Sequence, residues 1–266
     1  MISLSFCAFA GELDKIYETI ALVEKKDGIK VDVLVCCGDF QAVRNPDDLA
    51  CMACPVKYRE MNTFYKYFSG QKKAPVLTLY VAGNHEASNY HMELFHGGWV
   101  APNIYYMGHA NVLNVCGIRI AGLSGIYKRN HFHQGFHEKL PLNDGTMRSI
   151  YHVRETDVFR LLQVAEPIDV FISHDWPQRI YHYGNVQHLI RRKRHFEREI
   201  ADNSLGNPAH TKLLNILKPK YWFSAHLHVK FPAIVRHKSG GTTRFLALGK
   251  CLPRHDFLQV MLCAVQ

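Results

Sequence analysis

Four short groups of polar residues in this chain carry side chains that can bind a metal ion. They are Gly38-Asp39, Gly83-Asn84-His85-Glu86, Ser173-His174-Asp175 and Ser224-Ala225-His226-Leu227-His228. One carboxylate, one amide oxygen and three imidazoles form a set of oxygen and nitrogen ligands that suits Zn, Mn or Fe(II). Each group is common when it stands alone. Four of them, each at or just beyond the end of a predicted strand, predict one metal site.

The chemistry that this ligand set favours is hydrolysis of a phosphate ester. A phosphodiester resists attack because it is itself negatively charged. A bound metal neutralises that charge and lowers the pKa of a water molecule from about 15.7 towards ~7. The leaving alkoxide then needs a proton, which a neighbouring imidazole can supply. A carboxylate such as Asp39 has two oxygens and can bridge two cations, and His226 and His228 lie two residues apart.

Alternating strands and helices must position these groups. Continuous apolar runs predict buried strands over 2–7, 31–39, 76–83, 168–173 and 221–225, and shorter strands near 233–236, 244–248 and 257–262. Helical spacing predicts a helix from Glu12 to about Lys25 and a helical stretch near 59–68. Residues 111–125 are typical of a hairpin, with Cys116-Gly117 near its turn. In such an α/β chain, ligand sites lie at the carboxyl ends of strands.

Composition narrows the class of protein and of partner. The chain has 266 residues, of which 47% are hydrophobic, and carries a formal charge of +9 with 17 histidines in addition. A basic balance combined with phosphate chemistry favours a nucleic-acid substrate. No segment is long enough to span a membrane, and the eight cysteines fit reduced thiols of an intracellular protein. The basic run 191–194 fits an exposed helix face, with RNA contact as the second interpretation.

Residues 127–150 are polar, aromatic and basic, and show no periodicity. A loop of that length in a compact domain is usually functional or disordered. From the residues alone, a solvated insertion and a binding loop fit equally well. Aromatic rings that can stack on bases and cations that can bind phosphates lie in this loop and just after it, as a branched single-stranded RNA would require. These residues are Tyr127, Lys128, Arg129, His131, Phe132, His152 and Arg154.

The ordered series of motifs resembles the calcineurin-like metallophosphoesterase superfamily, and within it the RNA lariat debranching enzymes. The similarity covers about residues 11 to 259 and includes LVCCGDFQAVRN (34–45), APVLTLYVAGNHEASN (74–89), SHDWP (173–177) and YWFSAHLHVKF (221–231). The resemblance implies an α/β (α+β) fold, a double-layered β-sandwich flanked by helices. It also implies a metal-dependent RNA phosphodiesterase that hydrolyses the 2′-5′ branch-point linkage of excised intron lariats.

The family's residue roles can be carried over to matching positions. The resemblance implies that Asp39 bridges two metal positions, that Asn84, His174 and His226 complete one of them, and that His228 serves the other. It implies that His85 is the general acid. Residues from about 124 to 154 correspond to the family's lariat recognition loop, and branched intron RNA would be the partner. A location in the nucleus, with shuttling to the cytoplasm as an option, follows only from that substrate.

The first metal motif departs from the family pattern. Debranching enzymes carry Gly-Cys-x-His-Gly at the turn after the first strand, and the aligned positions here are Ala8 and Ala10. Cys7 lies one residue out of register, which in a strand turns its side chain to the opposite face. We therefore expect one well-occupied metal site, holding Fe(II), Zn or Mn, in place of two.

The chain also stops at Gln266, whereas family members continue into a further domain. We therefore expect one metallophosphoesterase domain over residues 1–266, with the family's C-terminal domain absent. Two alternatives to the active enzyme stay open. One is a catalytically impaired protein that still binds branched RNA; the other is a metallophosphoesterase acting on a protein phosphomonoester or a nucleotide, which the basic, aromatic loop disfavours.

Overall fold

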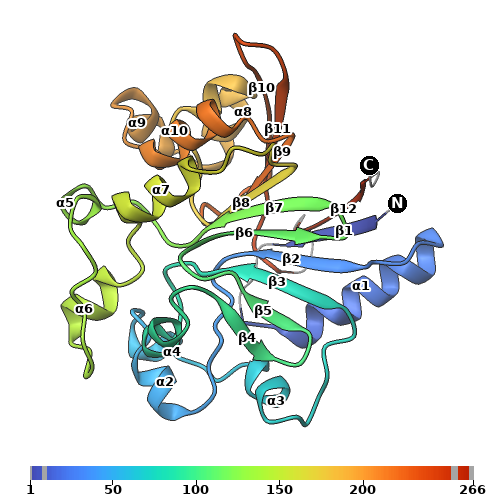
Figure 1. The fold of residues 1–266 in the computed structure, drawn as a ribbon, viewed down its shortest axis with the longest axis vertical. Helices are drawn as coiled ribbons and strands as arrows, with labels where there is room; N and C mark the ends of the chain where they lie inside the picture. The colour runs from blue at the N-terminus through green and yellow to red at the C-terminus, as the bar shows by residue number, and fades with distance from the viewer. Residues whose placement is uncertain (1, 8–10, 253–256, 264–266) are drawn as a thin grey trace.

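Two β-sheets, packed face to face, form the centre of the protein (Figure 1). The computed structural model describes residues 2–7, 11–252 and 257–263. Apolar side chains from both sheets fill the space between them, and the rings of Phe6 and Phe223 stack there with centroids 3.6 Å apart. The double-layered sandwich implied by the family resemblance is confirmed.

The first sheet has the strand order β12-β1-β2-β3-β5-β4. Its strands are β1 (Ile2–Cys7), β2 (Val33–Cys37), β3 (Leu77–Val81), β4 (Gly98–Ala101), β5 (Ile104–Tyr106) and β12 (Leu258–Cys263). Strands β1, β2, β3 and β5 run parallel, and the edge strands β12 and β4 are antiparallel to their neighbours. The carboxyl ends of β2 and β3 therefore lie side by side, which places Asp39 next to Asn84.

The second sheet repeats this plan, with the order β10-β11-β9-β8-β7-β6. Its strands are β6 (Ala110–Val115), β7 (Ile118–Leu123), β8 (Val170–Ser173), β9 (Tyr221–Ser224), β10 (Phe231–Arg236) and β11 (Thr242–Ala247). The inner strands β7, β8, β9 and β11 are parallel. The segments that carry His174 and His226 follow the neighbouring strands β8 and β9.

Helices cover the outer face of each sheet (Figure 1). On the first sheet these are α1 (Leu13–Asp27), α2 (Pro46–Ala50), α3 (Phe64–Phe68) and α4 (Ser88–Glu93). The later part of the chain adds α5 (Arg129–Phe132), α6 (Asp144–Ser149), α7 (Glu155–Leu162), α8 (Val186–Arg192), α9 (Phe196–Ala201) and α10 (Pro208–Leu217). Both faces of the inner strands are thus buried, which explains their continuous apolar sequences. None of the helices in the described residues is long and apolar enough to cross a membrane.

Most of the predicted elements are confirmed, including the hairpin, whose turn residues Cys116 and Gly117 have φ of 50° and 86° as a two-residue hairpin turn requires. The helical stretch predicted near 59–68 is shorter than expected. A 3-10 turn ends at Tyr58, Asn62 has a left-handed φ of 47°, and only Phe64–Phe68 is helical. Sequence patterns also missed β4 and β5, and the loop that showed no periodicity contains the short helices α5 and α6. The cysteines of the described residues are free thiols, as expected.

Candidate metal centre and the cleft beside it

Four predicted metal ligands converge where the two sheets meet. The Nε2 atom of His174 lies 3.1 Å from Oδ1 of Asn84, 3.3 Å from Oδ1 of Asp39 and 3.2 Å from Nδ1 of His226. Around an ion with ligands at about 2.1 Å, neighbouring ligand atoms are separated by ~3.0 to 3.4 Å in octahedral and tetrahedral geometry. The three distances are therefore those of adjacent corners of a coordination shell.

The orientation of the His174 ring supports a cation at this point. Its Nδ1 atom lies 2.8 Å from the carbonyl oxygen of Cys37, and a carbonyl can only accept, so Nδ1 carries a proton. In neutral His174 the lone pair of Nε2 then points at the carboxylate of Asp39 and at Asn84. A backbone carbonyl that fixes the ring in this way is common for histidines that bind metals. Lone pairs gathered in this manner fit a shared divalent ion.

The backbone of the site adopts conformations that most residues avoid. Asp39, His226 and His228 have φ of 54°, 56° and 54°, in the left-handed region, where non-glycine residues cluster at functional sites. Two glycines permit the close approach. A β-carbon at Gly38 would overlap the ring of His174, and one at Gly83 would overlap the carboxylate of Asp39. The lack of a side chain at Gly38 and Gly83 therefore lets the ligand-bearing turns approach this closely.

Glu86 joins the loop after β2 to the loop after β3, a role that the sequence analysis did not assign. Its Oε1 accepts hydrogen bonds from the backbone N–H of Phe40 (2.8 Å) and Gly83 (2.9 Å), and its Oε2 accepts one from Gln41 (2.7 Å). Burial and the negative charge of Asp39 raise the pKa of Glu86 to about 8. Its position in the Gly-Asn-His-Glu motif, next to two predicted functional residues, is the signal that could have identified it.

Charge interactions favour an ionised Asp39, and burial favours a neutral His226. Burial acts to raise the pKa of Asp39, but the charges of His174 and His85 and a hydrogen bond of 3.0 Å from the backbone N–H of His85 leave it below its usual value. Burial, and then the charge of His174, lower the pKa of His226 to about 3. An anionic oxygen and a neutral ring are the protonation states that a metal ion binds.

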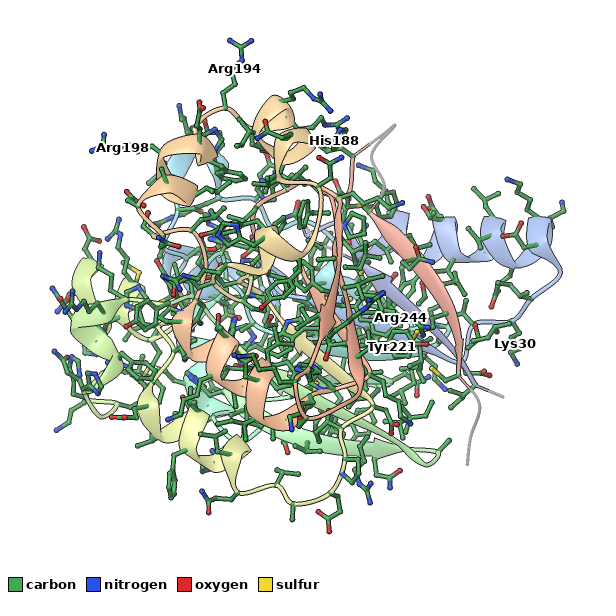
Figure 2. The ribbon with its side chains drawn as sticks, turned by 90° about the horizontal axis from the view of Figure 1, so that it is seen from above. Lys30, His188, Arg194, Arg198, Tyr221 and Arg244 are labelled. Carbon is green, nitrogen blue, oxygen red and sulfur yellow. The ribbon has the colours of Figure 1, made fainter. Side chains whose placement is uncertain are left out.

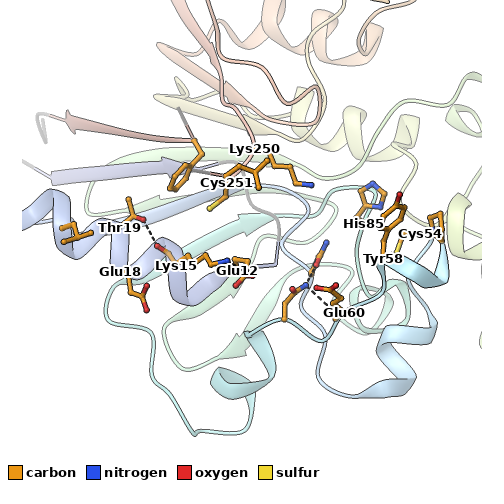
Figure 3. Close-up of a pocket in the computed structure, with 16 residues that line it drawn as sticks. Glu12, Lys15, Glu18, Thr19, Cys54, Tyr58, Glu60, His85, Lys250 and Cys251 are labelled. Atoms are coloured by element: carbon orange, nitrogen blue, oxygen red, sulfur yellow. Dashed lines mark hydrogen bonds and ion pairs between the residues drawn. The ribbon is translucent and has the colours of Figure 1, made fainter. Parts of the chain in front are cut away.

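His85 lies at one end of a cleft of ≈ 790 Å³ between α1, the segment 54–62, residues 250–252 and Phe257 (Figure 3). Figure 3 shows Tyr58 beside His85 and Lys250 extending towards this end, while Glu18 and Thr19 lie at the other end. Within the described part of the chain, no hydrogen bond engages the imidazole of His85, whose backbone is held by Asp39. The ring is therefore free to donate a proton to a bound group.

The remaining predicted ligand positions are not joined to this cluster. None of the hydrogen bonds among the described residues connects His228 to the other four, although its pKa responds to the charge of Asp39. Ala8 and Ala10 lie outside the described residues. No group of three or more His, Cys, Asp or Glu side chains in the described ranges is already spaced to enclose an ion, so the candidate site rests on the three distances to Nε2 of His174.

The structure contradicts direct contact between substrate and Arg154. This side chain is fully buried, and its guanidinium donates to the carboxylate of Glu138 (2.6 Å) and to the carbonyl oxygens of His131 (2.8 Å) and Ser149 (3.1 Å). It also lies over the ring of Phe136. Sequence reasoning took its charge as a sign of exposure. An arginine whose guanidinium is held in this way inside a loop positions that loop.

The other predicted loop residues divide into two groups. His152 is buried, its Nδ1 lies 2.7 Å from Nδ1 of His131, and burial lowers its pKa to about 4. It therefore also packs inside the loop. Lys128 and Arg129 are exposed and Tyr127 is half-buried, so these three remain accessible to a substrate.

We expect Arg154→Met to loosen the loop and leave the two sheets folded. The substitution keeps the length of the side chain but leaves the buried carboxylate of Glu138 without its cation, a change that costs about 3–5 kcal/mol for a buried pair. Hydrogen exchange should become faster across 124–154 and stay unchanged in β1 to β3. The matched control is Arg129→Met, since that arginine is exposed. Equal protection in both variants would contradict the assignment.

Family models match most of this chain. The model described as calcineurin-like phosphoesterase matches residues 10–230, and the model described as lariat debranching enzyme, C-terminal domain, matches residues 240–266. Among solved structures, the protein TT1561 of Thermus thermophilus aligns over 94% of this chain and 89% of its own, with a TM-score of 0.51 and 15% identity. That likeness concerns the fold alone.

Curated relatives are similar along almost all of the chain. The chain is 58% identical to lariat debranching enzyme A of Xenopus laevis, 59% to the lariat debranching enzyme of Homo sapiens and 52% to that of Arabidopsis thaliana. Each alignment covers 94% of this chain, but 48%, 47% and 60% of the respective relative. The chain thus spans about half the length of the animal relatives.

Proposed function

Because the chain belongs to the calcineurin-like phosphoesterase family, we propose that it hydrolyses the 2′-5′ phosphodiester at the branch point of excised intron lariats. The observation that carries the proposal is the convergence of Asp39, Asn84, His174 and His226 next to the free imidazole of His85. Its support on the substrate side is the name shared by the curated relatives and the cations exposed on the loop 124–154.

The family implies a divalent metal ion, which when bound neutralises the phosphate and activates water. Asp39, Asn84, His174 and His226 would hold it, and their mixed oxygen and nitrogen atoms suit Fe(II), Zn or Mn. We propose one well-occupied position. A second would have only Asp39 and His228 from this chain, and two protein ligands give a weak site.

His85 completes the reaction as a proton donor in this proposal. Scission of the 2′-5′ bond places negative charge on the ribose oxygen of the branch nucleotide, and an imidazole that protonates this oxygen stabilises the transition state. The hydrogen bond between the backbone of His85 and Oδ1 of Asp39 fixes the acid relative to the ligands. The backbone of the acid is therefore held against one ligand of the phosphate-binding ion.

The loop would hold the branched RNA above this centre. Tyr127 can stack on an unpaired base, and Lys128 and Arg129 can approach phosphates. Arg154 and Glu138 stabilise the loop from inside. We also propose a nuclear location, since the lariat arises there, and the prediction of a single domain over 1–266 stays a prediction.

A specific observation favours a second candidate. Ala8 and Ala10 stand where the debranching family carries two metal ligands, so a protein that binds branched RNA without cutting it is the alternative. We expect cleavage of a synthetic 2′-5′ branched RNA in the presence of Mn²⁺ or Fe²⁺, followed by gel electrophoresis. Binding without turnover would favour the alternative. Preference for p-nitrophenyl phosphate over branched RNA would contradict both.

A further inference from the structure

Four consecutive cations, Arg191 to Arg194, form a strip where α8 ends and the chain turns towards α9. Arg191, Arg192 and Arg194 are exposed and Lys193 is half-buried. Within the described residues, none of the four forms an ion pair or a side-chain hydrogen bond with a protein group. Figure 2 shows Arg194 and Arg198 extending away from the body of the protein. The positive charge of this strip is therefore not paired with any acidic group in the described part of the fold.

The helix dipole of α8 explains why only some of the four cations are favourable at these positions. Arg191 and Arg192 lie in the last turn of α8, where cations are favourable because of the helix dipole. Lys193 and Arg194 lie beyond the last helical residue and gain little from it. Segment 186–199 carries five basic residues against two acidic ones, so its charge is strongly unbalanced. An anionic partner is the simplest account of the excess.

The fold attaches the segment just before α8 to the strand that follows two predicted ligands. Gly184, just before α8, pairs with Ala233 of β10, and a β-carbon at Gly184 would overlap Phe231 and Pro232. The chain segment that leads into β10 is the one that carries His226 and His228. Helix α8, which carries the strip, therefore begins next to the strand that follows His226 and His228.

Loop 124–154 and the strip occupy different parts of the surface. In Figure 1, α5 and α6 project from one side of the molecule, and α8 and α9 lie above it on the second sheet. Three RNA strands meet at the branch nucleotide and extend away from it. The single loop 124–154 therefore cannot contact all three strands. A strip of flexible cations suits a strand whose phosphates are read without regard to sequence.

We propose that the strip Arg191–Arg194 binds the sugar-phosphate backbone of one arm of the branched RNA as that arm leaves the metal centre. This inference rests on the proposed function for the identity of the RNA. It assigns to the basic run a role separate from the recognition loop and from catalysis. The contacts involve charge alone, so they add affinity for long arms and no base preference.

The test compares the parent chain with the triple variant R191Q/R192Q/R194Q. Affinity for a long-armed branched RNA is measured by fluorescence anisotropy over a range of salt concentrations, without added metal. Each lost phosphate contact to a single strand removes about 0.7 from the slope of log K against log[salt]. The slope should therefore fall by about 2, and affinity near physiological salt should fall by roughly 10- to 100-fold. A branch trimmed to its core should show neither change.

The matched control is K25Q/K26Q/K30Q, which removes the same charge from the far end of α1, where Figure 2 shows Lys30 well separated from Arg194. We expect this control to keep the parent's slope. Equal slopes in both triple variants, or equal losses for long and trimmed RNAs, would overturn the proposal for the strip. A parent chain that binds RNA but cleaves neither substrate with Mn²⁺ contradicts debranching activity. The salt dependence of RNA affinity still tests whether the strip binds RNA.

Discussion

Replacing His85 with alanine is expected to lower kcat for branched RNA by about 10²–10⁴-fold, the usual contribution of a positioned general acid. Metal content and RNA affinity should stay close to those of the parent chain. The imidazole of His85 lies in the cleft and is not among the side chains that crowd around Nε2 of His174. Its backbone N–H, which holds Asp39, is retained in alanine. The loss should therefore fall on proton transfer alone.

A modified substrate separates proton donation from other roles of His85. When sulfur replaces the leaving 2′ oxygen, the departing thiolate needs no proton, so H85A should cleave this RNA almost as fast as the parent chain does. Single-turnover rates on the two substrates give the comparison. H96A removes a histidine that does not line the cleft and should behave as the parent chain on both. Loss of RNA binding in H85A, or no rescue by sulfur, would refute the assignment.

The double substitution Ala8→Cys plus Ala10→His should raise the metal content from one to two ions per chain. It restores the thiolate and the imidazole that the debranching family carries at this turn. A second ion stabilises charge in the transition state by several kcal/mol, so cleavage of branched RNA should rise on the order of 100-fold. Metal analysis after exhaustive dialysis and single-turnover kinetics provide the two measurements.

The control for this experiment is Ala8→Ser plus Ala10→Gln, which adds polar side chains of similar size without a thiolate or an imidazole. That variant should keep one ion and the parent's rate. Two tightly held ions in the parent chain would contradict the expected single site. A double variant that gains an ion but no rate would show that the missing ligands do not limit cleavage.

The centre of the site could be predicted because it follows from local patterns. Apolar runs mark buried parallel strands, and the ligands Asp39, Asn84, His174 and His226 come just after four of them. Parallel neighbours bring Asp39 beside Asn84 and His174 beside His226, and the packing of the two sheets brings these two pairs together. The sequence therefore predicts which residues gather, without predicting their distances or protonation.

Contacts between residues that lie far apart in the sequence could not be predicted from local patterns. The burial of Arg154 depends on Glu138, 16 residues away, and charge patterns alone favour exposure for an arginine. Glu86 resembles a surface residue until the loop after β2, more than 40 residues earlier in the chain, is placed against it. The short helices α5 and α6 have no hydrophobic periodicity of their own, and α6 begins at a capping box formed by Asn143 and Thr146.

Glu86 makes Asp39 and Asn84 a single energetic unit. One carboxyl group receives the N–H groups that follow Asp39 and the one that precedes Asn84, so any change that releases one loop also releases the other. In a double-mutant cycle the effects of substitutions at Asp39 and Asn84 on metal affinity would not add, because a substitution at either ligand also disturbs the loop that carries the other. The two single effects on metal affinity would therefore not sum to the effect of the double substitution, and the difference measures the coupling through Glu86.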